Sequence, residues 1–178
     1  MNIVWHTFRT PILCAAVGIL AGCATASKPE SMVAAPAETL ARHAKTVAVS
    51  TIGGKETSSV GKSQISDAAF AQALIASIEK TKVFSAVVQG AGANYMLSVA
   101  IISIDQPSFG LSFTVKMETA WTLKKADGSV AWQEVIKAEN TATTSDAFAG
   151  VERLRIANEG AARKSIEAGL SKIAKLSL

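Results

Sequence analysis

The chain has 178 residues, of which 49% are hydrophobic and 18% are charged, and its formal net charge is +4. This apolar composition excludes an intrinsically disordered protein, and the length excludes more than one ordinary domain. Two Cys and two His residues are too few for most zinc, iron–sulfur or disulfide frameworks, so we expect no metal and no cofactor. The net charge is too small to indicate binding to nucleic acid.

The first segment is predicted to be a secretory signal. Arg9 is its only firm positive charge, and every residue from Pro11 to Gly22 is apolar or Cys. As a helix, that apolar run would rise about 18 Å, well short of the roughly 30 Å of a membrane's hydrocarbon core. Residues 1–22 are therefore interpreted as a cleaved signal peptide and not as a permanent span.

The apolar run ends in Leu20-Ala21-Gly22-Cys23. This segment resembles the bacterial lipobox at all four positions, which implies cleavage before Cys23 and attachment of a diacylglyceryl group and an amide-linked fatty acid to it. One acyl chain binds a bilayer only marginally, at about 0.8 kcal/mol per buried CH2, whereas three chains make a lasting anchor. The resemblance implies a Gram-negative lipoprotein, and Ala24 after the Cys implies the outer membrane, on its periplasmic face. An ordinary signal peptide with a chance Cys is the alternative.

Residues 23–44 are predicted to be the acylated Cys followed by a flexible tether. Ala, Ser, Thr and Pro dominate this stretch, and no apolar period is sustained, although one helical turn near Glu38–His43 remains open. As a coil, the stretch would span about 25 Å on average. Residues 45–178 are then expected to form a single α/β domain.

Four elements are expected in the first half of the domain. A strand, a helix and two further strands are predicted at Thr46–Ile52, Asp67–Lys80, Phe84–Val88 and Tyr95–Ile104. Ser66 is a good N-cap for the helix. The last of these strands is apolar on both faces for much of its length, which is typical of a central strand.

The clearest pattern in the chain predicts a hairpin. Leu111–Leu123 alternates between a polar and an apolar face, and Asp127-Gly128 offers a two-residue turn. Folding there places opposite charges across the strands, which favours this register. The facing pairs are Glu118 with Lys137 and Lys116 with Glu139. After a polar loop, a last helix is predicted from about Asp146 to Leu176, with a bend at Gly160 left open. Its buried face is expected to include Leu154 and Ala162. Its outer face is expected to pair Glu152 with Arg155, Arg155 with Glu159 and Glu159 with Arg163.

The expected order is therefore β-α-β-β-β-β-α, a two-layer α+β sandwich. We expect a mainly antiparallel sheet of about five strands, the last four as a meander, with two helices on one face. This order resembles the auxiliary lipoproteins of ABC-type lipid transporters and the amino-terminal domain of the Tol-system propeller protein. The resemblance rests on the lipobox and on two inner segments, Glu79–Phe84 and Ala93–Val99. It implies a membrane-anchored accessory subunit and assigns a role to no single residue of the domain.

The sequence offers no catalytic constellation, and we do not expect an enzyme. His6 leaves with the signal peptide and His43 lies in the predicted tether, so a His-dependent triad is not expected. Glu134 is the one charge on the apolar face of its strand, opposite Trp121. It is either a buried functional acid or, as we favour, a rim carboxylate paired with Arg153 or Arg155.

Two other classes of function stay open beside the accessory subunit. The accessory subunit would bind an envelope protein in the groove between sheet and helices or at a strand edge. A lipid- or glycan-binding module would instead use an apolar pocket lined by Trp121, Trp132 and Phe113. A cell-wall hydrolase is the third candidate. Phe109, in the loop after Pro107, is expected to fold back on the sheet, and contact with a partner or a lipid is the alternative.

Overall fold

The computed structural model describes residues 24–35, 41–59 and 61–178. The predicted signal peptide and Cys23 lie outside these residues, so cleavage and acylation stay predictions. Residues 38–40 of the helical turn predicted near Glu38–His43 also lie outside them, and the described residues 41–43 are not helical. Within the described ranges, no helix combines the length and the apolar character needed to cross a membrane.

Five strands form one mixed sheet with the order β2-β1-β3-β4-β5. The strands are β1 (His43–Ile52), β2 (Phe84–Val87), β3 (Tyr95–Asp105), β4 (Phe113–Lys125) and β5 (Val130–Ala142). Strand β1 pairs in parallel with both β2 and β3, whereas β3, β4 and β5 form an antiparallel meander. The predicted four-stranded meander is therefore wrong for β2, because the intervening helix returns the chain to the start of β1 and β2 adds there in parallel. Strand β3 is central, as predicted.

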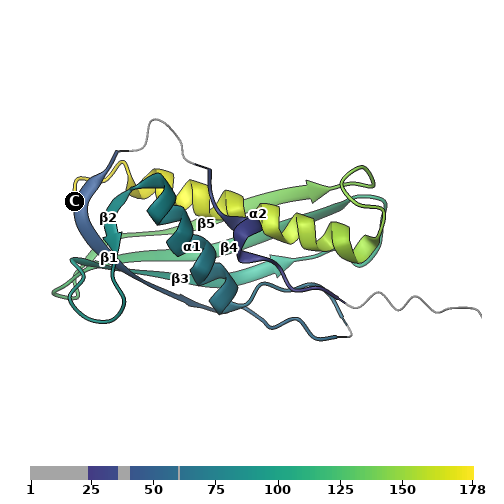
Figure 1. Cartoon of the computed structure of the whole chain (residues 1–178), viewed down its shortest axis with the longest axis horizontal. Helices are drawn as coiled ribbons and strands as arrows, with labels where there is room; N and C mark the ends of the chain where they lie inside the picture. The colour runs from purple at the N-terminus through teal and green to yellow at the C-terminus, as the bar shows by residue number, and fades with distance from the viewer. Residues whose placement is uncertain (1–23, 36–40, 60) are drawn as a thin grey trace, which may run out of the picture.

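Two helices, α1 (Asp67–Thr81) and α2 (Gly150–Ile173), cover one face of this sheet (Figure 1). Along β4, buried residues alternate with exposed or half-buried ones, as a sheet covered on one face requires. The buried face of β4 consists of Phe113, Val115, Met117, Thr119, Trp121 and Leu123. The predicted fold class and element order are confirmed.

Local contacts explain where the two helices begin. The side chain of Ser66 accepts a hydrogen bond from the backbone N of Ala69 at 3.2 Å, so the predicted cap of α1 is confirmed. Helix α2 begins at Gly150 and not at Asp146, because the Asp146 carboxylate instead accepts from the backbone N of Thr143 at 2.7 Å and closes a local turn. Helix α2 runs continuously through Gly160, the position where a bend had been left open.

The predicted register of β4 and β5 is confirmed from Phe113 to Leu123. Glu118 faces Lys137, and the two form an ion pair of 2.8 Å. The turn itself differs from the prediction, since the register shifts by one residue at Lys124 and the backbone N of Lys125 donates to the carbonyl of Ser129. The connection is a three-residue loop with Gly128 at φ +86°, a conformation that suits glycine.

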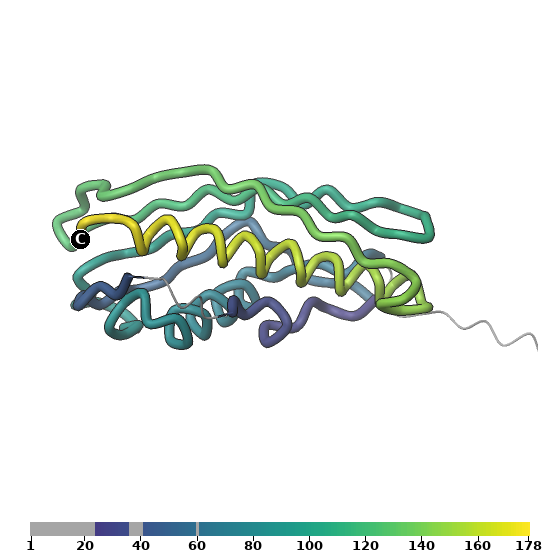
Figure 2. The backbone as a smooth tube through the Cα atoms, turned by 90° about the horizontal axis from the view of Figure 1, so that it is seen from above, coloured from purple at the N-terminus to yellow at the C-terminus, as the bar shows by residue number. Residues whose placement is uncertain are grey.

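The segment after the lipobox is part of the fold. Residues 27–35 pack beside α1 and α2 around a short 3-10 helix, η1 (Pro29–Met32), as Figure 2 shows. The side chains of Met32 and Ala34 are buried, and β1 begins at His43, inside the predicted tether. The predicted flexible tether is therefore wrong for residues 27–35, and for residues 43–44, which belong to β1.

Candidate functional site

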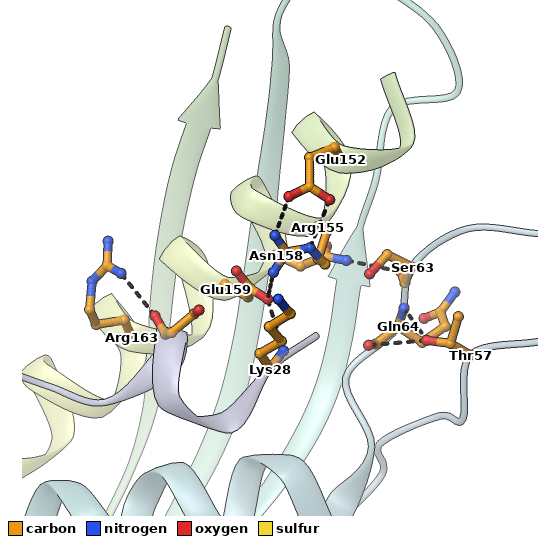
Figure 3. Close-up of polar contacts among 10 residues, drawn as sticks. Lys28, Thr57, Ser63, Gln64, Glu152, Arg155, Asn158, Glu159 and Arg163 are labelled. Carbon is orange, nitrogen blue, oxygen red and sulfur yellow. Dashed lines mark hydrogen bonds and ion pairs between the residues drawn. The ribbon is translucent and has the colours of Figure 1, made fainter. Parts of the chain in front are cut away.

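Backbone and side-chain contacts hold the N-terminal segment against α2 and the loop between β1 and α1 (Figure 3). The backbone N of Lys28 donates to Glu159 Oε1 at 2.8 Å, and Arg163 Nη1 donates to the carbonyl of Ser31 at 2.9 Å. The backbone N of Ser27 donates to the carbonyl of Gln64 at 3.1 Å. These bonds fix the point at which the chain leaves the domain toward Cys23.

Arg155 is the centre of the charge network at this point. Its guanidinium donates to both Glu152 and Glu159, as predicted from their helical spacing. The prediction that these pairs lie on an outer face is wrong, since Arg155 is only 8% and Glu159 only 4% exposed, beneath the N-terminal segment. The hydrogen bonds from Arg155 lower the pKa of Glu152, and those to Glu152 raise the pKa of the Arg155 guanidinium above its usual value. Glu152 and Arg155 therefore stay charged at neutral pH.

Asn158 joins three parts of the chain and was not foreseen. Its Nδ2 donates to the carbonyl of Ser63 at 2.9 Å, and its Oδ1 accepts from Gln106 Nε2 at 2.8 Å. Gln106 Nε2 also donates to the carbonyl of Ser63 at 2.8 Å. The sequence held one signal for it, because Asn158 lies four residues from Leu154 and four from Ala162 on the predicted buried face of α2.

Arg153 ties together the β3–β4 loop (residues 106–112) and the β5–α2 loop (residues 143–149). Its Nη1 donates to the carbonyls of Ala147 at 3.0 Å and Phe148 at 2.6 Å, and its Nη2 donates to the carbonyl of Gly110 at 3.3 Å. The guanidinium also lies over the Phe113 ring, 5.3 Å from its centroid. One buried cation thus sets the geometry of both loops.

The two loops present large apolar side chains to solvent. Phe109 is 88%, Leu111 80% and Phe148 94% exposed, and we refer to these three residues as the apolar tip. The prediction that Phe109 folds back on the sheet is wrong. Phe113 occupies the buried position beside Arg153, and Arg153 holds the backbone of Gly110 in place next to Phe109.

A surface cavity of about 280 Å³ lies next to the apolar tip. It is bounded by the β1–α1 loop, the β3–β4 loop and the start of α2, and Phe113 and Leu154 supply part of its apolar wall. Lys62 also lines the cavity, and its Nζ donates to the carbonyl of Gln106 at 3.0 Å and to Ser108 Oγ at 3.2 Å. The cavity is thus shaped by contacts between loops.

The predicted pocket of Trp121, Trp132 and Phe113 is not formed. Trp121 is fully buried, and its Nε1 donates to Thr119 Oγ1 at 2.8 Å, so it is a core residue. Trp132 is partly buried and packs against the core opposite Leu123. Phe113 and Trp121 lie eight residues apart on one strand, a separation of about 27 Å that prevents a shared pocket.

Glu134 faces Trp121, as predicted, but its ion-pair partner is different. It pairs with Lys172 near the end of α2, and both side chains are partly exposed. The interpretation of Glu134 as a rim carboxylate fits this contact. The predicted partners Arg153 and Arg155 are wrong, because both lie near the start of α2, far along the helix from Lys172.

His43 is held in place, although the sequence had assigned it to the tether. Its Nε2 lies 3.0 Å from the carbonyl oxygen of Ile173, and its ring stacks at a tilt against Phe84. Across the part of the chain that the structure describes, no group of three His, Cys, Asp or Glu side chains could hold a metal ion.

The fold defines a class of small α+β domains in which two helices cover one face of a five-stranded mixed sheet. A Xanthomonas campestris protein of family DUF330 is similar, with a TM-score of 0.61 and 10% identity over 78% of this chain and 89% of that chain. A hypothetical protein from Chlamydia trachomatis has a TM-score of 0.51 and 9% identity over 74% of this chain and 94% of that chain. A minor lipoprotein from Acinetobacter baumannii is more distant, with a TM-score of 0.47 and 7% identity over 73% of this chain and 92% of that chain.

No family model and no curated protein matches the sequence. The solved structures similar to this chain include bacterial lipoproteins. At identities near 10%, the likeness extends to the fold alone. The predicted links to transporter auxiliary lipoproteins and to the Tol-system domain stay predictions.

Proposed function

We propose that the chain is a lipoprotein of the outer membrane, anchored through acylated Cys23 on the periplasmic face, that works by binding a partner. In this role it is a non-enzymatic accessory subunit in envelope transport or assembly. The observation that carries the proposal is that the segment after the lipobox is part of the folded domain. In this segment the backbone N of Lys28 donates to the buried carboxylate of Glu159. Because this segment belongs to the domain, an anchor at Cys23 would position the whole domain at the membrane.

The edge of β5 is the surface that we assign to the partner. Strand β5 spans Val130–Ala142 and, among the described residues, pairs with β4 alone, so its outer edge is open to an added strand. The groove between sheet and helices, the other site considered, is filled by core side chains such as Trp121. Two side chains of α2 contact this strand: Lys164 Nζ donates to the carbonyl of Glu139 at 2.9 Å, and Lys172 pairs with Glu134. Val130, Gln133 and Val135 stay exposed.

The hydrogen bonds of the charge network around Arg155 support the non-enzymatic role. A glycosidase needs one carboxylic acid and one carboxylate that are free to act on a substrate. Glu152 and Glu159 are instead both bound to Arg155, and Glu159 also accepts the backbone N–H of Lys28. The cluster therefore serves to hold the N-terminal segment.

Metabolic labelling of the full chain with palmitate tests the anchor. We expect label on the wild-type protein and its recovery with the outer membrane. The Cys23→Ser variant should carry no label, since it lacks the acceptor thiol. Wild-type protein that stays unlabelled, or that fractionates away from membranes, would overturn the proposal.

Site-directed crosslinking tests the partner surface. Gln133 on the β5 edge and Ser98 on central β3 lie in the same transverse row of the sheet, so Gln133→Cys and Ser98→Cys form a matched pair. With Cys23 acylated, each variant carries one free thiol. In native membranes we expect a defined adduct from residue 133 and none from residue 98. Equal crosslinking from both positions would argue against binding at this edge.

A lipid- or glycan-binding module is the second candidate, and the cavity of about 280 Å³ favours it. Its volume is close to the lower limit of common ligand sites. Val151→Trp would fill the cavity from a residue that is partly exposed at its rim, with little change to the core. A lipid or glycan that co-purifies with the wild type and is lost from this variant would support the second candidate.

A further inference from the structure

The apolar tip is the largest departure from an ordinary protein surface in the described chain. Among the described residues, the three large apolar side chains with the greatest exposure are Phe148, Phe109 and Leu111. All three lie on the two loops that Arg153 joins. Clustered apolar side chains of this size on a soluble domain mark a surface that contacts a partner or a membrane.

The exposure is built into the fold. Arg153 is only 7% exposed and donates to the carbonyls of Ala147, Phe148 and Gly110, so the backbone next to each tip residue is fixed. The Phe113 ring lies under the guanidinium and is itself buried. The tip side chains are thereby directed outward.

The chain leaves toward Cys23 at the same end of the molecule. The bond between Ser27 and Gln64 places the N-terminal segment beside Ser63, which lines the cavity together with Ser108 and Phe113. From Ser27, the four residues back to Cys23 can extend at most about 14 Å. Figure 1 shows the first described residues at the end where β3 and β5 finish, opposite the C-terminus.

The chemistry of the two loops suits a lipid surface. Residues 106–112 contain no charged side chain, and residues 143–149 contain only Asp146. The Asp146 carboxylate is held by the backbone N of Thr143 at 2.7 Å. Acyl chains on Cys23 would hold the bilayer close to these loops, so the effective concentration of lipid there would be high even when a protein partner is bound elsewhere on the domain.

We propose that the apolar tip inserts into the surface of the bilayer that holds Cys23, so that the domain stands on the membrane on its Phe109–Phe148 end. This inference rests on the proposed acylation of Cys23. The acyl chains supply the lasting attachment, and the tip fixes the orientation of the domain. The β4–β5 turn then lies at the end that faces away from the membrane.

The test uses the full acylated chain in vesicles of phosphatidylethanolamine and phosphatidylglycerol. A fluorophore on Ser112→Cys, next to Leu111, reports on the tip while all three apolar side chains remain. The same fluorophore on Ala126→Cys, in the β4–β5 turn, is the matched control. We expect a doxyl-labelled lipid to quench the probe at residue 112 several-fold more than the probe at residue 126. Adding Phe109→Ser and Phe148→Ser should reduce the difference.

Equal quenching at the two positions, or quenching that the Ser substitutions leave unchanged, would overturn the inference. A probe at residue 112 that lipid does not quench in vesicles, but that is shielded from aqueous iodide in native membranes, would assign the tip to a protein partner instead. The anchor is scored separately by flotation. Protein that fails to float with the vesicles contradicts the acylation itself, whereas floating protein with equal quenching contradicts the tip alone.

Discussion

At the scale of single residues, the contact between Trp121 and Gly169 fixes how closely α2 packs on the sheet. A Cβ atom at residue 169 would lie 2.5 Å from the Trp121 ring. Trp121 cannot move aside easily, because its Nε1 is bonded to Thr119 Oγ1, which is in turn 2.8 Å from Ser165 Oγ. The absence of a side chain at Gly169 therefore leaves the space that the Trp121 ring occupies.

Gly169→Ala should lower the free energy of unfolding by about 1–3 kcal/mol, the usual cost of overpacking a core. Ala is favoured over Gly in a helix by about 1 kcal/mol, so a loss of stability would show that packing decides the outcome. Urea unfolding followed by Trp fluorescence measures this change.

Gly150→Ala is the matched control, since an added Cβ there would meet its neighbours at an ordinary 3.7 Å. We expect its stability to equal or slightly exceed that of the wild type. If the two Gly→Ala variants behaved alike, the close approach of Gly169 to Trp121 would not limit the packing of α2.

At the scale of elements, the N-terminal segment contributes to the core through Met32. This side chain is 0% exposed, whereas that of Met96 on β3 is 51% exposed on the open face of the sheet. Met32→Ala should lower the free energy of unfolding by about 2–5 kcal/mol, and Met96→Ala should change it by less than about 0.5 kcal/mol. Equal, small effects in urea unfolding would mean that the segment behaves as a tether after all.

The β4–β5 hairpin supplies a second test at this scale. Glu118→Lys places like charges opposite each other at Lys137 and should cost about 0.2–1 kcal/mol. The double variant Glu118→Lys, Lys137→Glu should recover most of that loss, because it restores an opposite-charge pair. A double-mutant cycle in low salt measures the coupling. A double variant as unstable as the single one would argue against this register in solution.

The hairpin was predictable because its information is local. Period-two alternation and facing charges select one register of two strands joined by a short turn. The parallel pairing of β2 with β1 was not predictable, because the sequence of a four-residue edge strand carries too little pattern to show whether β1 or β3 is its neighbour. The register shift between Leu123 and Lys124 was not predictable either, since the same Asp-Gly sequence fits both two- and three-residue loops.

The candidate sites were predictable only in part, for a related reason. Helical spacing revealed the Arg155 pairs, but their burial depends on residues 27–35, which bind mainly through backbone groups such as the N–H of Lys28. Backbone docking of this kind leaves little trace in the composition. The apolar tip depends on the hydrogen bonds from Arg153 to the carbonyls of two loops, and no sequence motif predicts these contacts.

At the scale of the whole molecule, the two ends differ in chemistry. One end combines the apolar tip, the cavity and the start of the N-terminal segment. The opposite end holds the β4–β5 turn, where Lys125 and Asp127 are exposed. With the first end at the membrane, the β5 edge would run away from the bilayer along the length of the domain. A partner strand could then bind without displacing the anchor.

Three carboxylates spread over the molecule should govern its stability in acid. Hydrogen bonds lower the pKa of Asp127 through Ser129, of Asp146 through Thr143 and of Glu152 through Arg155. A lowered pKa in the folded state means that the unfolded chain binds protons more readily. The stabilisation is therefore complete above the unfolded pKa values of about 4 and is lost as the pH falls through the lower folded values.

We expect the urea midpoint of the wild type to fall as the pH is lowered from about 5 to 3, and the triple variant Asp127→Asn, Asp146→Asn, Glu152→Gln to fall less steeply. At residues 127 and 146 the amide oxygen can still accept the hydrogen bonds from Ser129 and Thr143, so both turns are retained without the titrating charges. At residue 152 the amide keeps one of the two hydrogen bonds from Arg155. Urea unfolding at each pH measures both curves. Parallel curves would show that other carboxylates control the acid response. A variant already unfolded at pH 7 would show that the fold needs the charges themselves and not only the hydrogen bonds.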